Sequence, residues 1–131
     1  MEREIKFRGK RTDNKEWVCG DLVTGLNNEY YIRHVVEYGK SKCAEITMVD
    51  KETVGQFTGF TDSENNEIFG GNLINSYQND FMPTEVYWDD DLGQWATTNY
   101  HSTLSLCDSM QKDIKVLGNT YDNPELLTNS N

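Results

Sequence analysis

Carboxylate and amide side chains crowd into one short stretch, GQFTGFTDSENNEIFGG, which spans residues 55–71. Side chains of this kind bind Ca²⁺ in EF-hand loops, which require Gly at position 6 and a bidentate Glu at position 12. A loop that starts at Asp62 would place Glu67 and Leu73 at these two positions. The stretch therefore does not fit a calcium-binding loop.

The same stretch contains four glycines, Gly55, Gly59, Gly70 and Gly71, so a phosphate-binding loop is the next hypothesis. A P-loop needs a Lys directly after its last Gly. No Lys or Arg lies near these glycines, and the neighbouring carboxylates would repel phosphate. We predict a hairpin instead, in which DSENN turns the chain and Gly70-Gly71 permit a bend or bulge before the next strand.

Three consecutive aspartates, Asp89, Asp90 and Asp91, suggest a metal site at first sight. Neighbouring residues of a strand point to opposite faces, however, and Asp and Gly are common in turns. We predict that DDDLG is a turn between the strands EVYW and QWATT, with Trp95 at the head of the return strand.

No residue stands in a recognisable catalytic motif. His34 and His101 are far apart in the sequence, and no ligand-type residue lies at ligand spacing beside His34. We predict that His34 is a strand-face histidine and not a metal ligand. Ser and Cys lack a nucleophile elbow such as G-x-S-x-G. We therefore expect a protein that is not an enzyme and uses no cofactor and no metal, although distant carboxylates can still meet in a fold.

The three cysteines, Cys19, Cys43 and Cys107, are odd in number and widely spaced. This pattern indicates neither a disulfide framework nor a CxxC pair. We predict free thiols that are buried or half-buried.

The chain has a net charge of −10, and this charge is unevenly distributed. No Lys or Arg occurs between Glu52 and Gln111, a span that holds ten carboxylates: Glu52, Asp62, Glu64, Glu67, Asp80, Glu85, Asp89, Asp90, Asp91 and Asp108. Such a span fits either a solvated surface or a binding face for a basic partner. A more specific alternative is an acidic mimic of DNA, which requires carboxylates spaced like phosphates.

Basic residues gather near the N-terminus, where the arm consists of Lys6, Arg8, Lys10, Arg11 and Lys15. This arm is the candidate footprint for nucleic acid. The negative net charge of the molecule would oppose nucleic-acid binding at this arm, and the binding would depend strongly on salt. Nucleic acid is therefore a weaker alternative than a protein partner.

The hydrophobic pattern has a period of two residues along most of the chain, which is typical of strands. Besides the hairpin around DSENN, we predict three hairpins, one over residues 3–23, one from YYIRHVVEY and CAEITMVD around the turn GKSK, and one around DDDLG. TLSLCDSM and DIKVLGN follow as closing strands. DNPELL then fits a terminal helical turn with Asp122 or Asn123 as N-cap and Pro124 at its first position. The fold class is mainly β with minimal helix, in a single domain.

No apolar run approaches the roughly 20 residues that a membrane helix needs. The first residues, MEREIKFRGK, lack the apolar region of a secretory signal. A cytoplasmic location without membrane contact is the expectation.

As a set, four motifs resemble the YopX family of phage and prophage proteins: R-x-I-K-F-R-G-K, W-V-x-G-x-L, T-V-G-Q-F-T-G and G-N-x-Y-[DE]-N-P-E-L-L. The resemblance covers essentially the whole chain. Asn72 stands where an acid is more usual in the family. We assign structural roles to the motif positions Gly9, Trp17, Gly20, Gly55, Gln56, Phe57, Gly59, Gly71, Gly118, Asn119 and Pro124.

The resemblance implies N-terminal β hairpins over residues 1–57 and an SH3-like, partly open barrel over residues 58–123. A short terminal turn and a frayed tail would follow over residues 124–131. It also implies a mobile-element origin, a bacterial host cytoplasm and self-association into a homo-oligomer, but no established activity. Together with the absence of catalytic motifs, this favours an interaction or regulatory module that acts by binding a protein of the host or the phage.

Overall fold

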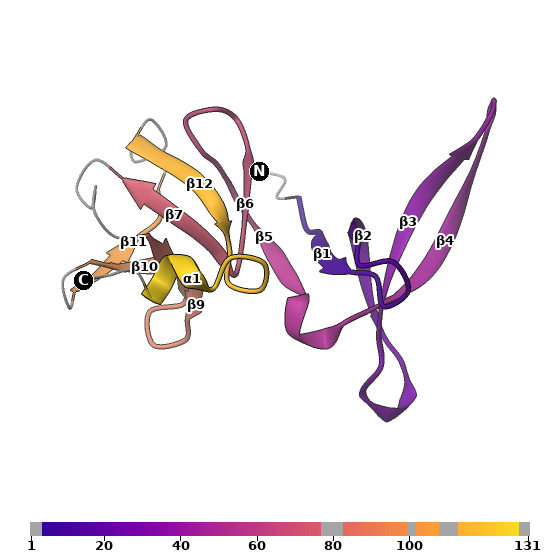
Figure 1. The fold of residues 1–131 in the computed structure, drawn as a ribbon, viewed down its shortest axis with the longest axis horizontal. Coiled ribbons are helices and arrows are strands. Elements are labelled where there is room, and N and C mark those ends of the chain that lie inside the picture. Colours follow the sequence, from indigo (N-terminus) through magenta and orange to yellow (C-terminus); the bar gives the residue numbers. More distant parts are fainter. Residues whose placement is uncertain (1–3, 77–82, 100–101, 108–112, 129–131) are drawn as a thin grey trace. The chain divides into compact units, whose positions relative to one another are not determined.

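Antiparallel strands make up most of this computed structural model, which describes residues 4–76, 83–99, 102–107 and 113–128 (Figure 1). The strands form one six-stranded sheet and two three-stranded sheets. Helical structure within these ranges consists of α1 (Glu125–Thr128) and two single 3-10 turns, η1 (Leu26–Asn28) and η2 (Lys51–Thr53). The prediction of a mainly β chain with minimal helix is confirmed.

The chain divides into two compact units, residues 1–57 and residues 58–131. The first unit contains β1 (Phe7–Lys10), β2 (Trp17–Thr24), β3 (Tyr30–Tyr38), β4 (Ser41–Val49) and the start of β5 (Gly55–Thr61). Their order in the sheet is β4-β3-β2-β1-β5, followed by β6 of the second unit. Both predicted hairpins of this unit are present, although the first strand begins at Phe7 and residues 4–6 lie outside it.

Among the described strands, the longest hairpin joins β3 and β4 (Figure 1). Nine residue pairs run from Tyr30↔Val49 to Tyr38↔Ser41 without a shift in register. The turn is shorter than the predicted GKSK, because Ser41 and Lys42 already pair with β3. Gly39 permits this tight turn with a φ of 62°.

The second unit contains β6 (Glu67–Phe69) and two three-stranded sheets. One sheet has the order β12-β7-β8, and the other has the order β11-β10-β9. Their strands are β7 (Asn72–Ser76), β8 (Thr84–Glu85), β9 (Tyr87–Asp89), β10 (Gln94–Asn99), β11 (Ser102–Ser105) and β12 (Ile114–Asn119). The core consists of Ile68, Ile74, Val86, Leu106 and Ile114, with Phe60, Trp95 and Val116 packed against it. These described strands form no closed barrel.

The aspartate-rich turn has the predicted structural role. Asp89 accepts hydrogen bonds from the backbone N–H groups of Asp91 and Leu92, at 3.0 and 3.3 Å. The turn places Trp88 opposite Trp95, and their rings meet edge to face with centroids 5.3 Å apart. The return strand begins at Gln94, one residue before the predicted Trp95.

The closing strands and the terminal helical turn are also present as β11, β12 and α1. The N–H of Leu127 donates to the carbonyl of Pro124, at 3.1 Å. Asn123 turns its side chain back to accept the N–H of Asn119 at 3.2 Å. Residues 129–131 of the predicted frayed tail lie outside the described residues.

Candidate binding surface

One face of the sheet in the first unit, here called the groove face, collects side chains from four strands. Strand pairing places Arg8 opposite Cys19, Asp21 opposite Arg33, and Arg33 opposite Ile46. Residues that lie opposite each other in paired strands share a face of the sheet, and so does every second residue along a strand. This rule gives the members of the groove face. The groove face consists of Arg8, Lys10, Trp17, Cys19, Asp21, Val23, Tyr31, Arg33, Val35, Glu37, Lys42, Ala44, Ile46 and Met48.

A groove of about 610 Å³ lies on this face, lined by residues 17–21 of β2, residues 33–35 of β3 and Ala44 of β4. Inside it, Arg33 and Asp21 form an ion pair at 3.1 Å. Both side chains are exposed to solvent, so the pair adds little stability. The groove therefore combines apolar lining residues, such as Trp17, Val35 and Ala44, with one charged pair that water can reach.

Basic side chains at one end of the groove face lie over aromatic rings. The guanidinium of Arg8 lies 4.4 Å from the ring centroid of Trp17, and the ammonium of Lys10 lies 5.7 Å from the same ring. Just before β1, Lys6 lies 4.9 Å from the ring of Phe57. Such cation–π contacts orient the cations along the sheet surface.

Apolar side chains at the other end of the groove face are open to solvent. Val35 is 66% exposed and Ile46 is 61% exposed. Ala44, which lies opposite Val35 in the hairpin, is exposed as well. Exposed apolar surface of this kind, beside a groove, is typical of protein interaction sites.

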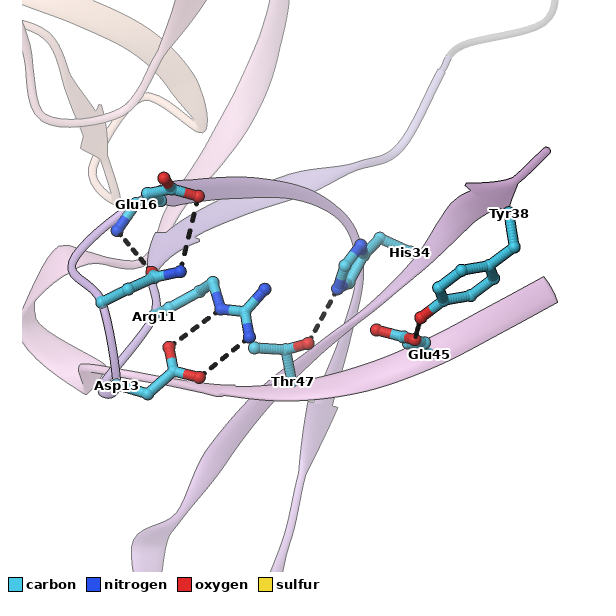
Figure 2. Close-up of polar contacts among 8 residues, drawn as sticks. Arg11, Asp13, Glu16, His34, Tyr38, Glu45 and Thr47 are labelled. Atoms are coloured by element: carbon cyan, nitrogen blue, oxygen red, sulfur yellow. Dashed lines mark hydrogen bonds and ion pairs between the residues drawn. The ribbon is translucent and has the colours of Figure 1, made fainter. Parts of the chain in front are cut away.

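On the opposite face of the β3–β4 hairpin, two pairs of polar side chains form hydrogen bonds (Figure 2). A ring nitrogen of His34 lies 2.8 Å from the hydroxyl of Thr47. Tyr38 donates its phenolic proton to Glu45, and this hydrogen bond raises the pKa of Tyr38. His34 is therefore the strand-face histidine that the sequence predicts. His101 lies outside the described residues.

The basic arm predicted near the N-terminus is divided by the fold. Arg11 donates two hydrogen bonds to the carboxylate of Asp13, at 2.9 and 2.8 Å, within the turn shown in Figure 2. The same hydrogen bonds lower the pKa of Asp13 and raise that of Arg11. Lys15 forms an ion pair with Asp50 at 3.1 Å. Arg8 and Lys10 thus remain together on the groove face, while Arg11 and Lys15 pair with acids of the turn region.

In the second unit, the acid-rich stretch is organised around Asp62, which is fully buried. Its carboxylate accepts the N–H groups of Glu64 and Asn66, the side-chain amide of Asn66 and the N–H of Val116. Burial by itself raises the pKa of Asp62, but these hydrogen bonds outweigh it and lower the pKa. The stretch is the predicted hairpin turn, tied to β12.

Asn72 is buried and structural. Its side-chain oxygen accepts the N–H of Phe69 at 2.7 Å, and its amide nitrogen donates to the carbonyl of Gly118 at 3.2 Å. An ionised Asp would bring a second acceptor against that carbonyl. The amide thus fits this site better than a carboxylate.

The whole net charge of the protein lies in the second unit. Residues 1–57 contain ten Lys and Arg and ten Asp and Glu, which gives a net charge of zero. Residues 58–131 contain two Lys and Arg and twelve Asp and Glu, which gives −10. Two acids of the Lys- and Arg-free span, Asp80 and Asp108, lie outside the described residues.

The motif positions are distributed over both units. Gly9, Trp17, Gly20, Gly55, Gln56 and Phe57 lie in the first unit, and Gly59, Gly71, Gly118, Asn119 and Pro124 lie in the second. Within the described ranges, no three His, Cys, Asp or Glu side chains gather at metal-binding distances. No helix in this part of the chain is long and apolar enough to span a bilayer.

The cysteine prediction is half wrong. As predicted, Cys19, Cys43 and Cys107 form no disulfide, but all three are exposed and none is buried. Cys19 lies on the groove face, and Cys43 lies on β4, the terminal strand of the sheet. Sequence reasoning also missed the open apolar face, although the adjacent pair Val35-Val36 places apolar side chains on both faces of β3.

Comparison with known proteins places the chain in a family. The model of the YopX family, described as YopX protein, matches residues 6–128, and the chain belongs to this family. No curated protein matches the chain. Among solved structures, the crystal structure of protein EF1440 from Enterococcus faecalis is similar, with 21% sequence identity and a TM-score of 0.60. The match covers 96% of this chain and 99% of that chain, and it shows a shared fold.

Proposed function

We propose that this member of the YopX family is a binding module without catalytic activity, and that its groove face recognises another protein. The observation that carries the proposal is the combination of exposed Val35 and Ile46 with the adjoining groove. Apolar side chains that remain open on a sheet face favour a protein partner. A phage or prophage origin, a cytoplasmic location and self-association remain proposals that the family resemblance suggests.

The test is affinity capture from bacterial lysate with the full chain, compared between variants. We expect Val35→Glu and Ile46→Glu to lose a protein that the wild type retains, because charge is costly to bury in an apolar contact. Leu26→Glu is the matched control, since Leu26 is 85% exposed in the same unit but lies in η1. The capture should resist nuclease and high salt.

Three results would contradict the proposal. If the Val35→Glu and Ile46→Glu variants still capture the protein, it binds the chain outside the groove face. Nucleic acid in the captured material that salt releases would indicate that Arg8 and Lys10 bind nucleic acid. Turnover of a substrate by the purified chain would make it an enzyme.

A second candidate function is supported by the charge of the second unit. A net charge of −10 over residues 58–131 favours a basic protein partner through long-range attraction. Such a partner would be released at high salt, unlike one held on the groove face. The more specific idea of a DNA mimic has less support, because the carboxylates of Asp62 and Asp89 accept hydrogen bonds within their own turns.

A further inference from the structure

We propose that the groove face holds its partner by strand addition, with an extended segment of a foreign protein pairing with the open edge of β4. This inference rests on the proposed function and specifies the mode of binding. In strand addition, backbone hydrogen bonds hold the segment and alternate side chains select its sequence.

The backbone of β4 presents a row of outward-facing groups. In an antiparallel pair, the N–H and C=O of one residue point to the same side, and the side alternates along the strand. The backbone N–H and C=O of Met48 point away from β3, because the carbonyl accepts the N–H of Thr12 at 3.1 Å. The register from Tyr30 to Tyr38 is unbroken. Lys42, Ala44 and Ile46 must therefore also point their backbone groups away from β3.

This edge is open over the middle of the strand. β4 is the terminal strand of its sheet, and among the described residues no backbone group bonds the outward side of Lys42, Ala44 or Ile46. Proteins usually block long edges with Pro, bulges, short strands or charged side chains such as Lys. β4 has nine residues, no Pro and no bulge, and its charged side chains are Lys42 and Glu45. Residues 10–12 already pair with its end, through Val49 and Met48.

The side chains beside the edge define the partner. Lys42, Ala44 and Ile46 have their side chains on the groove face, so a guest strand would lay every second side chain beside them. Small Ala44 and exposed Ile46 fit apolar guest residues. The charged side chains next to this edge already pair with each other on the groove face, Lys42 with Glu37 at 3.6 Å and Arg33 with Asp21 at 3.1 Å.

A foreign segment fits this edge better than a second copy of the chain. Each copy has a net charge of −10, so mutual repulsion disfavours the pairing of two copies. A segment that alternates apolar residues matches the exposed side chains of Ala44 and Ile46 beside the edge. The occupant we assign is therefore an extended segment of a foreign protein with an apolar residue at every second position.

The experiment is a selection of random linear peptides on the immobilised full chain, followed by binding measurements on variants. Ala44→Pro removes one outward N–H and is compatible with an edge strand. Ala44→Ser is the matched control, because it keeps the N–H. We expect the selected peptides to bind Ala44→Pro about tenfold more weakly or worse, and Ala44→Ser nearly as well as wild type.

Hydrogen exchange on the wild-type chain gives a measurement that does not depend on the folding of Ala44→Pro. Bound peptide should slow exchange at the amides of Lys42, Ala44 and Ile46. The amides of Cys43 and Glu45, which face β3, should change little. Circular dichroism and thermal melting establish whether Ala44→Pro is folded.

The outcomes separate this inference from the proposed function. If Val35→Glu and Ile46→Glu lose the peptides but Ala44→Pro keeps them, the groove face binds without strand addition and only this inference fails. If all three variants keep them, both proposals fail. A selection without enrichment overturns strand addition by a foreign segment. So does a wild-type chain that self-associates while Ala44→Pro stays monomeric, since the occupant would then be a second copy.

Discussion

The carboxylate of Asp62 joins two segments that are distant in the sequence, because it accepts N–H groups from its own turn and from Val116 of β12. Asp62→Ala would leave these donors without their acceptor. We expect it to lower the free energy of unfolding by about 2–4 kcal/mol in denaturant titrations. Glu64→Ala is the control, since Glu64 is exposed and forms a surface ion pair with Lys115. Equal losses in the two variants would contradict the role of Asp62.

The same residue contributes a pH dependence whose sign follows from its lowered pKa. A carboxyl group with a lower pKa in the folded state stabilises the protein above its unfolded pKa, about 3.9. That stabilisation disappears as the pH falls through the folded pKa. The stability gap between wild type and Asp62→Ala should therefore be constant near neutral pH and shrink below about pH 4. A gap that widens in acid would contradict the lowered pKa.

At the scale of elements, the approach of β2 to β3 depends on a missing side chain. A Cβ on Gly20 would lie 2.1 Å from the carbonyl oxygen of Arg33, so the two strands would have to separate. Gly59 differs, because its φ is 90° and a Cβ there would meet open space. We expect Gly20→Ala to prevent stable folding or cost several kcal/mol, and Gly59→Ala to cost about 1–3 kcal/mol from backbone strain.

Thermal melting of the two variants measures this difference. Gly59→Val, with a β-branched side chain at the same positive φ, should be less stable than Gly59→Ala. A Gly20→Ala protein that melts like the wild type would show that β2 and β3 lie further apart. A Gly59→Val protein with unchanged melting that loses a partner would move Gly59 from a structural to a binding role.

Strands and turns could be predicted from the sequence, because alternation and turn chemistry act over a few residues. DSENN and DDDLG form the expected turns, and Asp62 and Asp89 supply their hydrogen bonds. Burial could not be predicted in the same way, because it depends on which strands pair. Cys43 has an ordinary strand context, yet β4 is an edge strand and the thiol is exposed. The groove face likewise exists only once four strands are in register.

At the scale of the whole molecule, charge rather than fold separates the two units most clearly. The first unit balances ten cations with ten carboxylates, and pairs such as Lys15 with Asp50 lie within it. The second unit has two cations, and Lys115 is engaged with Glu64. Repulsion among carboxylates should therefore act on the second unit and hardly on the first.

Charge reversal at one exposed residue of each unit tests this division. Asp90→Lys, in the turn of the second unit, relieves repulsion and should raise the melting temperature by roughly 2–4 °C at low salt. Added NaCl screens the same repulsion, so the gain should fade at high salt. Glu52→Lys makes the same charge change in the neutral unit and should raise the melting temperature little at any salt concentration. If Glu52→Lys raised the melting temperature as much as Asp90→Lys did, with the same dependence on salt, the repulsion among carboxylates would have to be spread over the whole chain.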